Sequence, residues 1–194
     1  MKKIIGKALI VIGAGIILLT AYTNYNVEKN NNNLVKEFEK NIQNNKNSES
    51  KQMEKGEEKT INNKQDVIAI LEIPKIDLKV AVKEGTDQKT LDYSVGHFDQ
   101  TQMPGQYGNF AVAGHRNYTS NKFFSNLDEL ERGDNIVVHT LDEKYTYIVD
   151  SKEVVTPDKV EVLDSDENKK MITLITCTPK YVGTHRLVVN GYIE

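Results

Sequence analysis

The sequence predicts a mostly β protein: a small closed β-barrel of about seven to eight strands with a few short helices, preceded by a transmembrane helix. Two observations predict this architecture. An apolar stretch is confined to the N-terminus, and from residue 67 onward short β runs alternate with turn residues. A polar stretch separates the two regions. We therefore divide the chain into a signal anchor at 1–23, a polar linker at 24–65 and a β-barrel at 66–194.

The N-terminal apolar stretch runs from residue 4 to residue 22 and is flanked or interrupted by Lys2, Lys3 and Lys7. As a helix it spans about 28 Å at roughly 1.5 Å per residue, enough to cross the hydrocarbon core of a bilayer. The lysines at one end and Glu28 beyond the other favour a cytoplasmic N-terminus and an external C-terminus. A cleaved signal peptide is the alternative. We favour an uncleaved anchor, because signal-peptide cores are shorter and no small-x-small site follows.

Residues 24–65 are rich in Asn, Lys and Glu and almost lack aromatic side chains. Such a segment buries too little apolar area to offset its ordering entropy, so we expect a charged, extended spacer. One exception is predicted inside it. Leu34, Val35, Phe38 and Ile42 recur at helical spacing and indicate a short amphipathic helix that lies on the barrel or on the membrane.

Short runs of β-branched and aromatic residues predict the strands of the barrel. They cover 67–73, 78–82, 109–113, 135–141, 145–156, 171–176 and 186–193. Pro74 separates the first two strands, and the pairs Gly133-Asp134 and Asp142-Glu143 mark turns. Helical segments are predicted near 89–93 and 121–130. About 130 residues are enough to bury a real core.

Composition excludes several classes of function. The formal net charge is -3 and no basic stripe lies outside the extreme N-terminus, so nucleic-acid binding is not indicated. The single cysteine, Cys177, excludes an intramolecular disulfide and an all-cysteine metal site. A lone thiol is unusual in an exported protein because exposed thiols oxidise. The alternative is a buried cysteine that acts as a small hydrophobe.

The segment most informative about chemistry is 173–191, TLITCTPKYVGTHRLVVNG. A strand of β-branched residues ends at Cys177, and a loop returns the chain to a strand that starts near Arg186. We therefore expect the two side chains next to each other at the ends of neighbouring strands. A cation beside a thiol favours the thiolate, which is the nucleophilic form. A buried cysteine near an unrelated surface arginine is the alternative.

A cysteine nucleophile needs an acid or base partner within hydrogen-bond reach, and histidine is the usual one near neutral pH. Of the four histidines, His115 is the best candidate, because it sits at the exit of the strand 109–113 in AVAGHRN. His139 lies in the middle of a predicted strand. His185 adjoins Arg186, so strand alternation sends those two side chains to opposite faces.

Taken together, these residues resemble the sortase family of bacterial cysteine transpeptidases. The TLITC string, the arginine that opens the last strand, the upstream Gly-His and the basic-apolar N-terminus carry the resemblance, which covers residues 67–194 and the anchor. The strings GHFDQTQMPGQYGNFAVAGHR and TLITCTPKYVGTHRLVVNG are most similar to class D. THRL is also similar to pilin-polymerising class C enzymes, but no class C lid segment or C-terminal membrane helix is seen.

The resemblance implies a single-pass membrane enzyme of the Gram-positive cell surface, with its catalytic domain outside the cell. It implies cleavage of an LPxTG-type sorting signal between Thr and Gly and transfer to a peptidoglycan amine, with slow hydrolysis as a side reaction. Cys177 is implied as the nucleophile, His115 as acid and then base, and Arg186 as the stabiliser of the oxyanion. No cofactor is needed for two successive acyl transfers.

Two further residues are expected at the substrate site. Thr176 shapes the oxyanion site or is simply a good strand former, and His97 lines the site or stabilises a turn. Glu72, Asp77 and Glu153 are candidates for a Ca²⁺ site like that of some class A sortases. Scattered carboxylates on strands are usually solvated, so no metal is predicted.

Two other classes of function remain open. A membrane-tethered barrel that binds wall or peptide ligands, with an inert Cys177, predicts no loss of function in Cys177→Ala. A cysteine peptidase that only hydrolyses exported proteins predicts products unaffected by added amines.

Overall fold

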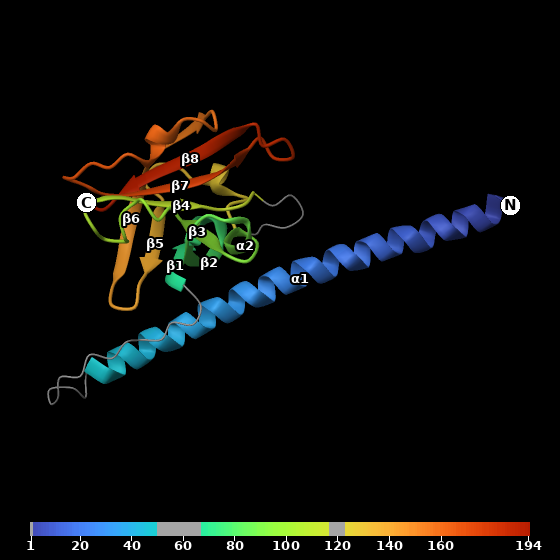
Figure 1. Ribbon diagram of the computed structural model, residues 1–194, viewed down its shortest axis with the longest axis horizontal. Helices are drawn as coiled ribbons and strands as arrows, with labels where there is room; N and C mark the ends of the chain where they lie inside the picture. The colour runs from blue at the N-terminus through green and yellow to red at the C-terminus, as the bar shows by residue number, and fades with distance from the viewer. Residues whose placement is uncertain (1, 50–66, 117–122) are drawn as a thin grey trace.

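A computed structural model of the chain describes residues 2–49, 67–116 and 123–194. Figure 1 shows a barrel with one long helix that passes along it and projects beyond it. In chain order the elements are α1 (Lys2–Glu49), β1 (Val67–Ile73), η1 (Pro74–Ile76), β2 (Leu78–Glu84), α2 (Gln88–Leu91), β3 (Val95–His97), β4 (Gly108–Ala113), η2 (Leu127–Glu129), β5 (Asn135–His139), β6 (Lys144–Val155), η3 (Val160–Leu163), β7 (Lys170–Thr178) and β8 (His185–Tyr192).

The strands close into a barrel in the order β1-β2-β3-β4-β7-β8-β6-β5. Neighbouring strands are antiparallel except for the parallel pairs β2–β3 and β4–β7. This closed mixed barrel confirms the predicted fold class. Its interior is filled by alternate residues of the strands, among them Leu71, Val80, Val112, Leu174 and Val189, which are almost completely buried. Each such side chain contributes about 1.5–3 kcal/mol by leaving water.

Two local predictions differ from the structure. Strand β3 was not predicted, because three residues are too few to show an alternating pattern. The helix expected at 121–130 is reduced, in its described part, to the 3₁₀ turn η2. Phe124, Leu127 and Leu130 have helix-like spacing, but all three are buried in the barrel core, where a repeat of three suits a 3₁₀ turn.

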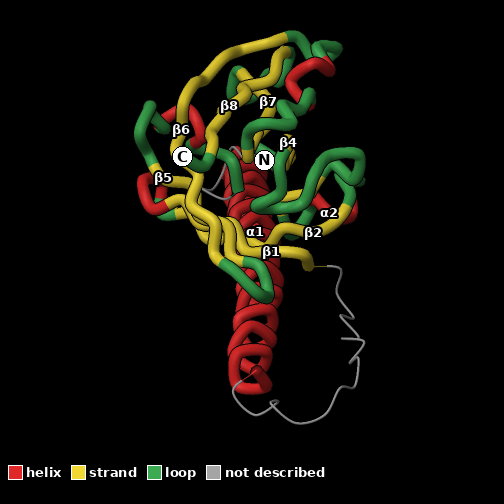
Figure 2. Tube along the Cα trace, turned by 90° about the vertical axis from the view of Figure 1, so that its left-hand side faces the viewer, coloured by secondary structure: helices red, strands yellow, loops and turns green. Residues whose placement is uncertain are grey.

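Helix α1 corrects the expected linker. It continues without a break to Glu49, so the extended spacer is wrong over 24–49, while 50–65 lies outside the described residues. The reason is an apolar contact: Val35 and Phe38 are buried against β1 and β2. The amphipathic helix predicted around these residues is therefore confirmed, and it lies on the barrel. Figure 2 shows α1 passing on the side of β1 and β2.

Polar contacts also hold α1 against the barrel. The side chain of Asn31 accepts from the backbone N–H of Ala81 at 3.1 Å and donates to the carbonyl of Lys79 at 3.2 Å. The Lys79 ammonium lies 2.6 Å from Glu39. Near the end of the helix, Asn45 donates to Asp142 in the β5–β6 turn at 3.0 Å. The contacts extend over several helical turns, so they set both the position and the angle of α1.

Candidate active site

The three residues predicted as catalytic meet at one edge of the barrel. The parallel register of β4 and β7 pairs Ala113, the last residue of β4, with Ile175, three residues before the end of β7. Two residues beyond this pair along each segment lie His115, just after β4, and Cys177, within β7, and both line a pocket of about 460 Å³. Across the antiparallel pair β7–β8, Cys177 lies directly opposite Arg186. Side chains at such paired positions are close neighbours on one face of the sheet.

Arg186 is held by the backbone around it. Its Nη1 donates to the carbonyl of Gly183 at 3.2 Å and to its neighbour His185 at 3.1 Å. Across the described ranges, no carboxylate lies within ion-pair distance of this guanidinium. No described residue therefore neutralises its positive charge, which suits a group that stabilises negative charge formed only during a reaction.

The residues on either side of Cys177 bind the residues on either side of His115. Thr176 Oγ1 donates to the carbonyl of Gly114 at 2.7 Å. Arg116 Nη1 donates to Thr178 Oγ1 at 2.8 Å. We call these four residues the His–Cys clamp: Gly114, Arg116, Thr176 and Thr178. Because one bond lies on each side of the pair, the clamp fixes how the histidine segment sits against the cysteine strand.

Arg116 is the clamp residue that sequence reasoning missed. It is buried, its Nη2 lies 2.7 Å from Asp128, and its Nε donates to the carbonyl of Ser125 at 3.4 Å. A buried arginine is costly unless it is paired and hydrogen-bonded, and here it is both. The available signal was a cation adjacent to the candidate histidine in AVAGHRN, but local sequence does not reveal burial.

We expect Arg116→Ala to lower kcat by about 10–100-fold with little change in KM, because small misplacements of reacting groups are costly. Thr178→Val removes only the hydroxyl of the clamp and should reproduce the loss without unpairing Asp128. Arg116→Lys should restore the ion pair but not the fork geometry. The measurement is steady-state kinetics across pH, since a loosened His115–Cys177 pair also changes the pH profile. An unaltered kcat and pH profile in Thr178→Val would rule out the clamp as a positioning device.

The turn that carries α2 supports His115 from the other side of the pocket. Asp87 caps the helix by accepting from the Thr90 hydroxyl at 2.8 Å and from its backbone N–H at 3.2 Å. The Thr90 hydroxyl is the main cause that lowers the pKa of Asp87 below its usual value, followed by the Thr90 backbone N–H. Gln88 donates to Asp92 at 2.8 Å, and its Nε2 lies 3.3 Å from His115 Nε2. Gln88 is thus a second site residue that sequence reasoning did not find.

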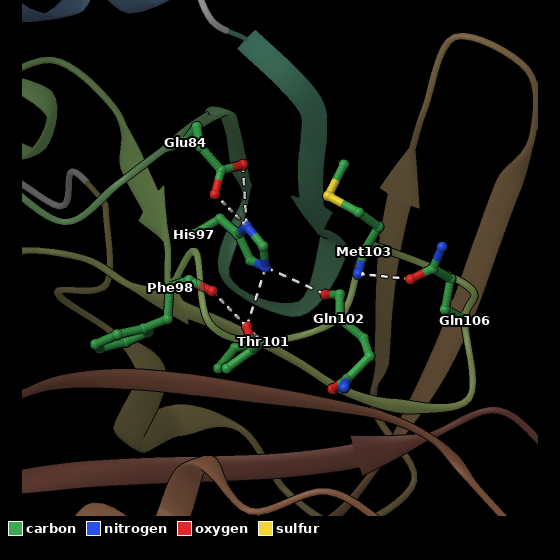
Figure 3. A network of polar contacts seen from close by, with 8 residues as sticks. Glu84, His97, Phe98, Thr101, Gln102, Met103 and Gln106 are labelled. Carbon is green, nitrogen blue, oxygen red and sulfur yellow. Dashed lines mark hydrogen bonds and ion pairs between the residues drawn. The ribbon is translucent and has the colours of Figure 1, made fainter. Parts of the chain in front are cut away.

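Thr176, predicted to contact substrate, is almost fully buried and serves the clamp through its hydroxyl. His97 does not line the pocket that holds Cys177. It is 1% exposed, with Nδ1 3.0 Å from Glu84 and Nε2 3.1 Å from the carbonyl of Gln102 (Figure 3). The Thr101 hydroxyl lies 3.0 Å from the same Nε2. These contacts favour the second role that the sequence left open, stabilisation of the turn after β3.

We expect His97→Ala to lower the free energy of unfolding by about 2–3 kcal/mol while leaving KM for a peptide substrate unchanged. The substitution removes buried hydrogen bonds and the ring that packs on Phe110 at a centroid distance of 5.0 Å. Thermal unfolding and steady-state kinetics measure the two effects. His139→Ala is the control, because that half-buried histidine pairs with Glu72 at the surface and should cost less than about 1 kcal/mol. A several-fold rise in KM at unchanged stability would instead place His97 at the substrate.

The carboxylates considered for Ca²⁺ do not gather. Glu72 pairs with His139 at 3.0 Å, and Glu153 pairs with Lys159 at 3.2 Å. Asp77 ends the turn η1 in a left-handed conformation with φ 49°. Within the part of the chain that the structure describes, no group of three or more His, Cys, Asp or Glu is placed to hold a metal ion.

The face of the sheet that carries Cys177 continues as an apolar patch. Ile175 precedes Cys177 by two residues on β7 and pairs with Val188 on β8, so both share its face. The 3₁₀ helix η3 covers them from outside. The patch consists of Val155, Ile175 and Val188, with Phe98, Val162 and Leu163 packed against it.

Comparisons with known proteins give one consistent family. A model of the sortase domain matches residues 71–194. Sortase SrtE1 of Streptomyces coelicolor is 40% identical over 138 residues, which cover 63% of this chain and 39% of that protein. Sortase A of Bacillus anthracis is 35% identical over 129 residues, which cover 66% of this chain and 60% of the relative.

Among solved structures, a Clostridium perfringens sortase D5 transpeptidase superposes with a TM-score of 0.68 at 30% identity. The match covers 86% of this chain and 99% of that one. By contrast, the chain spans only 39% and 60% of the length of the two sequence relatives. Relatives carry the designations A, D and E, so the assignment to class D stays a prediction.

Proposed function

The chain belongs to the sortase family, and from that premise we propose that it is a cysteine transpeptidase that attaches exported proteins to the bacterial cell wall. The observation that carries the proposal is the meeting of His115 and Cys177 in one pocket, with Arg186 directly opposite the cysteine. A nucleophile, a proton-transfer group and a cation at one strand edge are what acyl transfer through a thioester requires.

The proposed reaction has two acyl transfers. The Cys177 sulfur, having given its proton to His115, attacks the Thr carbonyl of the sorting signal, and Arg186 stabilises the oxyanion that forms. His115 gives a proton to the Gly nitrogen as the Thr–Gly bond breaks, leaving a thioester on Cys177. An incoming peptidoglycan amine then loses a proton to His115, attacks the thioester carbonyl and expels the Cys177 thiolate. No redox step is involved, and the atoms balance without a cofactor.

The apolar patch supports an LPxTG-type substrate. Ile175 and Val188 lie two residues from the site of attack along their strands, a distance of about 7 Å at 3.3 Å per residue. In an extended peptide, the Leu-Pro pair precedes the scissile Thr by two and three residues, and is therefore about 7–10 Å from it. Because η3 buries these two residues, a Leu-Pro pair at that distance would meet the half-buried side chains that cover them, Phe98, Val162 and Leu163, while the Thr carbonyl lies at Cys177.

Helix α1 supports the proposed membrane anchor. It contains a segment that is long and apolar enough to cross a bilayer. Its large apolar side chains, among them Leu9, Ile10, Val11, Ile17 and Leu18, are 64–73% exposed and make no core of their own. Exposed apolar side chains around a whole helix are stable in lipid but not in water. We propose a single-pass protein with a cytoplasmic N-terminus and an external catalytic barrel.

The test uses the full-length chain in lipid nanodiscs with an LPxTG-type peptide, with and without a short peptide that offers a free N-terminal amine. Mass spectrometry should show cleavage between Thr and Gly, and a ligated product whose share rises with the amine concentration. Cleavage that yields the same hydrolysed product at every amine concentration would favour the peptidase. No cleavage across a panel of motifs, with Cys177 inert to thiol reagents, would favour the binding module.

A further inference from the structure

One wall of the catalytic pocket comes from outside the barrel. Helix α1 contributes four residues to the pocket that holds His115 and Cys177. These four are Thr20, Thr23, Asn24 and Val27. They overlap and directly follow the end of the apolar stretch at residue 22. The same helix that serves as the proposed anchor therefore also borders the reacting groups.

The helix geometry sets the height of the pocket above a membrane. From Thr20 to Val27 an α-helix rises about 10 Å. The headgroup layer beyond the hydrocarbon core is about 5–7 Å thick on each side of a bilayer. If the hydrocarbon ends with the apolar stretch, this wall lies at the level of the headgroups. Tyr22 and Tyr25 are 63% and 62% exposed at this level, and interfacial tyrosines are typical there.

The barrel cannot swing freely about this helix, because its contacts with α1 reach from Asn31 to Asn45. Phe38 is buried in the middle of them. Figure 1 shows the N-terminal half of α1 projecting past the barrel on the side where the β7–β8 turn lies. A helix that spans the membrane would therefore present that edge of the barrel to the lipid.

The β7–β8 turn carries the side chains that such a position requires. Tyr181 is 74% exposed and Val182 is 68% exposed, and both lie between Cys177 and Arg186 in the chain. Adjacent exposed apolar side chains mark interaction surfaces, and tyrosine is favoured where one end of the side chain is in lipid and the other in water. The turn and the pocket mouth form what we call the catalytic edge: residues 179–184 with Cys177 and His115.

We propose that the catalytic edge docks on the outer surface of the membrane, so that Cys177 works at the level of the phospholipid headgroups. This proposal depends on the proposed function only for the role of α1 as the membrane anchor. The partner of the catalytic edge is a lipid bilayer. Reactants anchored in the same membrane would reach the pocket by lateral diffusion, whereas a reactant free in solution would have to enter beside the lipid.

The single cysteine allows a direct measurement. A nitroxide spin label is attached to Cys177 of the full-length chain in liposomes that contain a nickel-chelating headgroup lipid. The nickel ion speeds the relaxation of a label more strongly the closer that label lies to the headgroups. A second label is placed at Tyr181→Cys and a third at Lys144→Cys, each in a Cys177→Ser background. Lys144 is exposed beside the β5–β6 turn that Asn45 contacts, about 30 Å farther along α1 than the pocket wall. Relaxation should be several-fold stronger at 177 and 181 than at 144.

Phe38→Asp should release the barrel from α1 and bring the three labels toward equal relaxation. The milder double variant Asn31→Ala/Glu39→Ala, which removes polar contacts between α1 and β2, should have the same effect. Glu37→Ala, an exposed neighbour of Phe38, should preserve the difference. Equal relaxation at 177 and 144 in the unaltered chain, when the chain floats with liposomes, overturns the docked edge but not the anchor. A chain that does not float overturns the anchor and this inference together. Peptide ligation by unlabelled protein in nanodiscs tests the activity separately from both.

Discussion

Cys177→Ala should lower kcat/KM for a sorting-signal peptide by about 10³-fold or more, to the level of the uncatalysed reaction. The thiol is the only group in the proposed mechanism that forms a covalent bond with the substrate. Alanine removes it without a large change in volume at a half-exposed position, so the barrel should keep its fold. No other cysteine in the chain can take over its role.

The measurement for Cys177→Ala combines turnover with a search for the thioester. Intact-protein mass spectrometry of the unaltered chain, quenched in acid before an amine is added, should show the acyl adduct. The variant should show none. Thr146→Ala, which alters an exposed residue of β6 outside the catalytic edge, serves as the control and should retain turnover. Cleavage by Cys177→Ala at more than a few per cent of the normal rate would mean that another group is the nucleophile.

Arg186→Ala should lower kcat by about 10²–10³-fold, the range observed when one oxyanion-stabilising donor is removed from an enzyme. The guanidinium lies opposite Cys177 and has no ion-pair partner among the described residues, so its charge is available to the developing oxyanion. Because that charge forms mainly in the transition state, KM should change much less than kcat. Arg186→Lys should recover part of the loss, since it keeps the charge without the planar fork.

Arg132→Ala is the matched control for Arg186. Its side chain is 78% exposed and pairs with Asp150 on the surface at 3.1 Å, so its loss should not affect kcat. Both variants lose one positive charge. A difference in kcat between them therefore reflects the position of Arg186 and not the change in net charge. A rise in KM of Arg186→Ala that accounts for the whole loss, at unchanged kcat, would assign Arg186 to substrate binding instead.

The clamp gives a physical reason why these effects should be large. Catalysis through a thioester depends on a short and constant distance between the nucleophile and its proton-transfer partner. In this barrel the clamp holds the segment that carries His115 against the strand that carries Cys177. Thr176 and Thr178 tie the cysteine strand to Gly114 and Arg116 by hydrogen bonds of 2.7 and 2.8 Å. Cys177 lies on the strand that the clamp holds, and Arg186 lies opposite it on the neighbouring strand.

Much of the barrel follows from local sequence. Runs such as VIAILEI and TLITCT alternate or concentrate β-branched residues, and each forms a strand at nearly the predicted bounds. Cys177 and Arg186 could be placed opposite each other because a short turn connects two antiparallel strands, which is a local property. The apolar segment proposed as the anchor was evident for the same reason, since its signal is a continuous apolar run.

What the tertiary structure alone decided involves contacts between residues far apart in the chain. A polar composition favours an extended spacer after residue 23. Helix α1 nevertheless continues to Glu49, because Phe38 is buried against β1 and β2. Likewise, local sequence does not show that Arg116 is buried between Asp128 and Thr178. His97 was left open as a site or a turn residue, and its enclosure by Glu84 and Gln102 appears only in the fold. The sequence by itself determined most of the strands, though not β3, and indicated which residues can carry the chemistry. Only the tertiary structure decided which polar groups are buried. Burial costs them their contacts with water, and the hydrogen-bond partners that offset this cost lie far away in the sequence, where local spacing does not reveal them.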